Sequence, residues 1–165
     1  METERHTIVA LVQDKPGVLN KLAGMVRRRG FNISSLTVAH SEQNNYSRMT
    51  FVVEGDEATI NQVINQLYKI IEVVKVSDIT KENVVIRELA LIKVATTPTN
   101  RPEIFQLVEV FRSNILDVSS DSVIIEVTGD ENKVDSLLAI LEPFGIKEVM
   151  RTGRVGLIRG ISNSI

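Results

Sequence analysis

The stretch DKPGVLNKLAGMVRRRGFNI, residues 14–33, joins a turn, an amphipathic segment and the start of a strand. Residues 6–13 (HTIVALVQ) precede it as a short apolar run, which predicts a β-strand. After Gly17, apolar residues recur at helical spacing, and three arginines followed by Gly30 suit the negative end of a helix dipole and a left-handed C-terminal residue. The stretch therefore predicts strand, turn, helix and strand in that order.

The residues that follow complete one structural unit. FNISSLTVAH (31–40) and SRMTFVVEG (47–55) predict two strands joined by a polar hairpin. Asp56 predicts the N-cap of a second helix, and residues 72–80 predict a closing strand. That helix carries an apolar stripe, formed by Ile60, Val63, Ile64, Leu67 and Ile71. The order βαββαβ in one sheet is the ferredoxin-like arrangement, with both helices on one face.

The second half of the chain repeats this pattern. Adding 74 takes residues 55–57 (GDE) onto 129–131 (GDE), and four residues of the helical stripe onto Val134, Leu137, Leu138 and Leu141. Adding 85 takes Leu19, Leu22, Ala23 and Val26 onto Ile104, Leu107, Val108 and Phe111, and residues 31–33 onto 116–118. The two offsets, 85 and 74, differ by 11, so the second copy is shorter by 11 residues between these elements. The polar residues 41–46 of the first copy are the natural place for this difference. The sequence therefore predicts an α+β protein with two ferredoxin-like βαββαβ domains in tandem, residues 1–80 and 84–165.

Composition narrows the function. The net charge of −2, a pI near 5.8 and 4% aromatic residues argue against nucleic-acid binding. The absence of cysteine excludes disulfides and thiolate metal sites, and no apolar run approaches the roughly 18 residues of a membrane span, so we expect a cytoplasmic location. His6 and His40 are isolated, and no nucleophile and base can be paired, which argues against an enzyme.

The turn at residues 14–17 has two interpretations. Asp14 can be a helix N-cap with Pro16 as a preorganised first-turn residue. Alternatively, the N–H groups of Gly17 and Val18 bind a ligand carboxylate at the positive end of the helix, and Asp14 binds an ammonium. A free α-amino acid carries both groups. With the offset of 85, Gly17 falls on Pro102, which has no N–H, so only the first copy would bind a ligand.

Asn32 is the other polar candidate, at the start of the second predicted strand. In a ferredoxin-like sheet this strand lies at an edge, and an exposed edge invites pairing with another chain. Pairing two such edges would bring Asn32 of one chain toward the turn of the other. A homodimer with shared sites is the resulting hypothesis.

Five blocks of the sequence resemble one family almost end to end. They are DKPGVL (14–19), RGFNISSLTV (29–38), SRMT (47–50), FR (111–112) with ILDV (115–118), and RTGRVGLIRG (151–160). These blocks resemble the regulatory (small) subunit of acetolactate synthase, also called acetohydroxyacid synthase, whose N-terminal part is an ACT domain, an amino-acid-sensing module.

This resemblance implies a non-catalytic partner of the large subunit, the thiamine-diphosphate enzyme that makes 2-acetolactate in branched-chain amino-acid biosynthesis. The small subunit would activate the catalytic subunit and confer feedback inhibition by valine. Thiamine diphosphate, Mg²⁺ and FAD are expected on the catalytic subunit, and no cofactor is expected in this chain. The alternative is a free-standing ACT-type sensor that regulates another enzyme.

The resemblance also assigns the effector site at the ACT dimer interface. The matching positions are Asp14, Gly17, Val18 and Leu19 in the turn, and Asn32 and Ile33 across the dimer. Residues 151–160, with three arginines among three glycines, could be either a loose tail or a docking segment.

Overall fold

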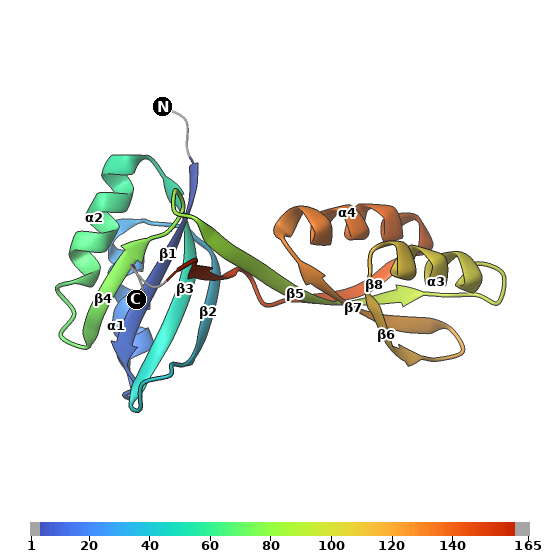
Figure 1. Cartoon of the computed structure of the whole chain (residues 1–165), viewed down its shortest axis with the longest axis horizontal. Helices are drawn as coiled ribbons and strands as arrows, with labels where there is room; N and C mark the ends of the chain where they lie inside the picture. Colours follow the sequence, from blue (N-terminus) through green and yellow to red (C-terminus); the bar gives the residue numbers. More distant parts are fainter. Residues whose placement is uncertain (1–3, 161–165) are drawn as a thin grey trace. The chain divides into compact units, whose positions relative to one another are not determined.

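The structure, a computed structural model, describes residues 4–160, which divide into two compact units (Figure 1). The first unit contains residues 4–85 together with 153–160, and the second contains residues 86–152. Each unit has an antiparallel β-sheet and two α-helices in the order βαββαβ, which confirms the predicted α+β class. The division differs from the predicted one at the C-terminal end, because residues 153–160 pack with the first unit.

In the first unit, the strands follow the order β2-β3-β1-β4. The elements are β1 (Glu4–Gln13), α1 (Val18–Arg29), β2 (Ile33–His40), β3 (Tyr46–Gly55), α2 (Glu57–Leu67) and β4 (Val73–Asp78). Alternate residues of β1, namely Ile8, Ala10 and Val12, are buried against apolar residues of α1 and α2. Both helices therefore cover one face of the sheet, as the strand period of two requires.

The end of α1 and the start of α2 follow the predicted signals. α1 closes at Gly30, which has φ +72°, and α2 begins at Asp56, whose carboxylate accepts from the Thr59 N–H at 2.8 Å. The prediction that Ile71 belongs to the apolar stripe of α2 was wrong. α2 ends at Leu67 because the chain turns there to align β4 with β1, and Ile71 lies in that turn with 91% of its surface exposed.

The second unit repeats the architecture, with strands in the order β6-β7-β5-β8. Its elements are β5 (Val84–Ala95), α3 (Arg101–Val110), β6 (Asn114–Val118), β7 (Ser122–Gly129), α4 (Glu131–Leu141), the 3-10 turn η1 (Glu142–Phe144) and β8 (Ile146–Arg151). Asp130 caps α4 as Asp56 caps α2, through the Lys133 N–H at 2.9 Å. Val134, Leu137 and Leu141 are fully buried, so the offset of 74 is confirmed.

The offset of 85 between the first helices was wrong. The N-cap residues are Gly17 in α1 and Asn100 in α3, an offset of 83, and the buried residues Leu22 and Val26 match Ile104 and Val108 at an offset of 82. The turn residue Gly17 therefore corresponds to Asn100, not to Pro102, and the argument from a missing proline N–H does not hold.

The predicted correspondence between the second strands of the two units, β2 and β6, was also wrong, and by a larger number of residues. Leu36 of β2 lies opposite Phe51, and Ile115 of β6 lies opposite Ile125, an offset of 79 rather than 85. The missing length is therefore shared between the helix–strand connection and the hairpin, and is not confined to the hairpin. Hydrophobic spacing alone did not reveal this because one apolar pair can match at several offsets.

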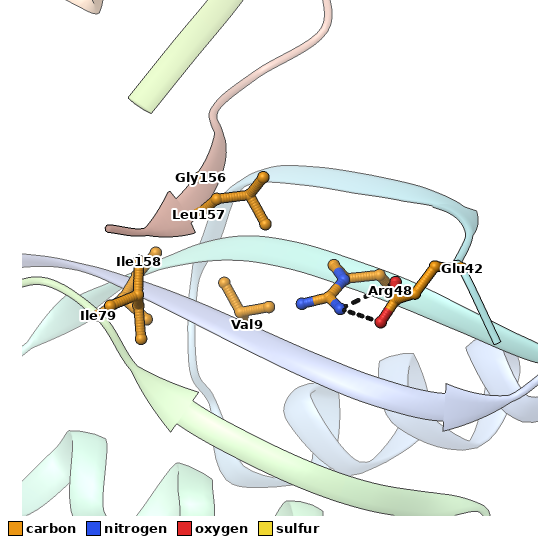
Figure 2. A pocket seen from close by; sticks show the side chains of 7 residues that line it. All are labelled: Val9, Glu42, Arg48, Ile79, Gly156, Leu157 and Ile158. Atoms are coloured by element: carbon orange, nitrogen blue, oxygen red, sulfur yellow. Dashed lines mark hydrogen bonds and ion pairs between the residues drawn. The ribbon is translucent and has the colours of Figure 1, made fainter. Parts of the chain in front are cut away.

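Residues 153–160, here called the C-terminal strap, pack on the first sheet and include β9 (Val155–Ile158). The Arg159 N–H donates to the Asn83 carbonyl at 2.8 Å. Figure 2 shows β9 on one side of the sheet and the helices on the other. Residues 153–160 therefore pack on the chain's own first sheet and are not a loose tail.

Gly153, at the start of the strap, admits no side chain. Its φ is +79°, and a Cβ there would lie 2.8 Å from the Ser35 Cβ. Gly153→Ala is expected to lower the free energy of unfolding by about 1–3 kcal/mol. The alanine would clash with Ser35, and its backbone would be strained in the left-handed region. Gly24→Ala is the control: Gly24 lies inside α1 with open space, so this variant should gain about 0.5–1 kcal/mol. Urea denaturation measures the free energy of unfolding of both variants. Equal values for the two would contradict the close packing of Gly153 against Ser35.

Candidate effector site on α1 and β2

The turn before α1 leaves backbone donors open. Gly17 is the N-cap residue, with φ +87° and no side-chain hydrogen bond to the helix. Among the described residues, no partner is found for the N–H groups of Gly17 and Leu19, whereas the Val18 N–H donates to the Lys15 carbonyl at 3.3 Å. These open donors lie at the positive end of the helix dipole, which favours an anionic group.

Asp14 does not cap the helix, so the first interpretation of the turn was wrong. Its Oδ2 lies 3.1 Å from His40 Nδ1, and its N–H donates to the Asn45 carbonyl at 2.8 Å. Both groups are largely exposed, so their attraction is weak and the carboxylate remains accessible. Sequence reasoning missed His40, because β3 separates β1 from β2 and nothing in the local pattern links their ends.

The apolar candidates do not all face outward. The Val18 side chain belongs to the core and is 3% exposed, so it can contribute only backbone atoms to a site. Leu19 and Ile33 line one apolar groove between α1 and β2, and Asn32 and Ile33 line an adjoining hollow. This surface can receive an apolar side chain.

The two ends of the predicted site are separated within one chain. Asp14 and Gly17 precede α1, and Asn32 and Ile33 follow it. The helix has 12 residues, which is roughly 18 Å at 1.5 Å per residue. A ligand the size of an amino acid cannot span that distance, so the six candidates can form one site only if two chains contribute.

The two edges of the first sheet differ in their protection. At the β4 edge, the Tyr68 hydroxyl donates to the Val76 carbonyl at 3.0 Å and accepts from the Val76 N–H at 3.1 Å. At the β2 edge, the apolar residues Leu36 and Val38 are 42% and 40% exposed. Since an uncovered apolar edge favours strand pairing, β2 is the edge suited to a second chain.

The corresponding turn of the second unit is filled by its own side chains. The Arg101 guanidinium donates to the carbonyls of Ser119 and Ser120 at 2.8 and 2.9 Å, and the Asn100 side chain accepts from the Thr97 N–H at 2.7 Å. Asn100 is the N-cap residue there, as Gly17 is in the first unit, and Glu103 in the first turn of α3 adds a negative charge that disfavours an anion. The open helix start is therefore a feature of the first unit.

Residues 4–160 offer no second kind of site in their histidines, acidic clusters or helices. These residues contain no cluster of three or more histidine, aspartate or glutamate side chains that could hold a metal ion. His6 is buried, with Nδ1 2.7 Å from Asp78 Oδ2, in a contact that ties β1 to the end of β4. No helix in this range is long and apolar enough to cross a membrane.

Comparison with known proteins points to one family. The family model for the small subunit of acetolactate synthase matches residues 87–160, and the model for the ACT domain of these small subunits matches residues 8–75. A probable acetolactate synthase small subunit of Archaeoglobus fulgidus is 56% identical over 94% of this chain and 98% of that protein. The acetolactate synthase small subunit of Bacillus subtilis is 45% identical over 94% of this chain and 91% of that protein.

A solved structure agrees with these matches. The crystal structure of the acetolactate synthase small subunit from Thermotoga maritima superposes with a TM-score of 0.89 and 46% identity. The match covers 96% of this chain and 99% of that one.

Proposed function

Because the chain belongs to the family of acetolactate synthase small subunits, we propose that it is a regulatory subunit that activates the catalytic large subunit and makes it sensitive to valine. The observation that carries the proposal is the open helix start at Gly17 beside the Asp14 carboxylate. A donor pair for a carboxylate and an acceptor for an ammonium are what a free α-amino acid requires.

Each site would combine two chains of a homodimer. The valine carboxylate would accept from the N–H groups of Gly17 and Leu19, and its ammonium would displace His40 from Asp14. The isopropyl group would lie against Leu19 and against Ile33 of the second copy, whose Asn32 would close the polar end. Pairing of the two β2 edges would allow the start of α1 in one chain to face β2 in the other. The exposed apolar residues Leu36 and Val38 on that edge support this arrangement.

The chemistry would belong to the catalytic subunit, with thiamine diphosphate, Mg²⁺ and FAD bound there, in the cytoplasm where branched-chain amino acids are made. Feedback would require a coupling free energy of about 1–3 kcal/mol between the valine site and that subunit. A pocket that discriminates single methylene groups gains only about 1–3 kcal/mol per group, so leucine should also inhibit at higher concentration.

Reconstitution tests the proposed function. Adding this protein to a purified acetolactate synthase large subunit should raise its turnover several-fold, and valine should then inhibit the mixture but not the large subunit alone. Acetolactate formation is measured against concentration of the small subunit, with heat-denatured small subunit as the control. An unchanged rate with no valine effect would refute the proposal.

A further inference from the structure

A second cavity lies on the helix-free face of the first sheet, beneath the C-terminal strap. It has a volume of about 280 Å³ and is lined by Val9, Glu42, Arg48, Ile79, Gly156, Leu157 and Ile158. Residues of two of the sequence blocks described above, SRMT (47–50) and RTGRVGLIRG (151–160), line this cavity, and the valine site gives these blocks no role. Its size is at the lower end of small-molecule pockets, which suits a small metabolite.

One wall of this cavity carries a charge of each sign. Both hydrogen bonds of Arg48 run from Nη2 to the Glu42 carboxylate, at 3.0 and 3.1 Å. No other partner of Arg48 is found among residues 4–160, and Figure 2 shows a guanidinium nitrogen directed toward Val9, away from Glu42. The guanidinium therefore has donors left for a second carboxylate.

The carboxylate of Glu42 can rearrange. Its side chain is 64% exposed, whereas that of Arg48 is 20% exposed. A backbone hydrogen bond, and after it the Arg48 guanidinium, holds the pKa of Glu42 below its usual value, so the group is charged at neutral pH. An exposed pair of this kind is weakly held, so a ligand can insert beside it without breaking a strong contact.

The remaining walls are apolar. Val9 and Ile79 come from the sheet side, where they are already covered (1% and 0% exposed), and Ile158 comes from the strap (Figure 2). Val155 and Leu157 are exposed while Gly156 is buried, so position 156 faces the sheet and its missing side chain leaves room in the cavity. An adjacent cation and anion beside apolar walls match an ammonium and a carboxylate one carbon apart, with an apolar side chain attached.

We propose that this cavity is a second amino-acid site, in which Arg48 binds the carboxylate of an apolar α-amino acid, Glu42 binds its ammonium, and Ile158 of the strap contacts its side chain. The site lies within the first unit of a single chain and needs no dimer. Because the strap forms one wall, an occupied cavity would hold the strap on the sheet.

Calorimetry on the full chain tests the second site. The Gly17→Asp background removes the proposed turn site, and L-leucine, L-isoleucine and L-valine are the probes. At least one should still bind at one per chain, and Arg48→Met or Gly156→Val in that background should weaken this binding at least tenfold. Arg28→Met, on the exposed surface of α1, is the matched control and should bind as the background does.

The ligand's two charges are tested with analogues of leucine. 4-Methyl-2-oxopentanoate lacks the ammonium and isopentylamine lacks the carboxylate, so each should bind at least tenfold more weakly than leucine. Thermal melting checks that each variant is folded, and Glu42→Gln supplies a third variant in case another does not fold. Absence of binding in the Gly17→Asp background, or binding that none of the three variants changes, would overturn the proposal. Neither result bears on activation of the large subunit, which is measured without amino acids.

Discussion

Gly17→Asp is expected to weaken valine binding at the turn site at least 100-fold, which is about 2.7 kcal/mol, and to leave activation of the large subunit in place. The substituted carboxylate would lie at the open N–H groups that should bind the ligand carboxylate, and would repel it. No heavy atom outside the adjacent residues lies within 4 Å of a Cβ built at Gly17, so the fold should accommodate the change apart from strain at φ +87°. Valine inhibition of the reconstituted enzyme is the measurement.

The matched control is Gly145→Asp in the second unit. Gly145 also has a left-handed backbone, with φ +92°, and a Cβ there would make an ordinary 3.6 Å contact with Ala95. This variant carries the same strain and the same added charge away from the turn, so its valine inhibition should match that of the unsubstituted protein. Equal losses in both variants would assign the effect to stability rather than to the site.

Leu36→Lys is expected to raise the dissociation constant of the dimer at least 100-fold and to remove valine inhibition with it. Leu36 is half-exposed on the β2 edge and lines the groove beside α1, so a lysine there places charge where two edges should pair. Sedimentation velocity over a range of protein concentrations measures the dimer. Activity assays on the same samples show whether inhibition follows the dimer fraction.

Val74→Lys is the control on the other edge. Val74 of β4 is 49% exposed, and the Tyr68 hydroxyl covers the backbone of nearby Val76. This variant should remain a dimer with unchanged valine inhibition. Dissociation by Val74→Lys but not by Leu36→Lys would mean that β4, not β2, forms the dimer.

The βαββαβ order could be predicted from the sequence because its signals are local. The Gly30 stop and the Asp56 cap act within one helical turn, and the apolar spacing of α2 needs no knowledge of its neighbours. The residue-by-residue correspondence between α1 and α3 was harder to predict. The offset of 85 placed exposed Leu19 on buried Ile104, because spacing shows which residues are apolar but not which are buried.

The positions of the candidate site residues in the fold could be predicted in part. Asp14, Gly17 and Leu19 border the open helix start, but the exposure of Leu19 and the burial of Val18 depend on how α1 lies on the sheet. The contact of His40 with Asp14 and the packing of the strap on Ser35 link residues far apart in the sequence. No periodicity signals such contacts, and a glycine-rich end is usually loose.

Mixing two defective variants tests the shared site most directly. If each site takes Gly17 from one chain and Asn32 from the other, a heterodimer of Gly17→Asp and Asn32→Ala chains has one intact site and one doubly altered site. After exchange of subunits, about a quarter of all turn sites should regain the unsubstituted affinity for valine, as measured by calorimetry and by inhibition of the reconstituted enzyme. Recovery of about that size is the result expected here, and a mixture that binds no better than the two separate variants would contradict a site shared between chains.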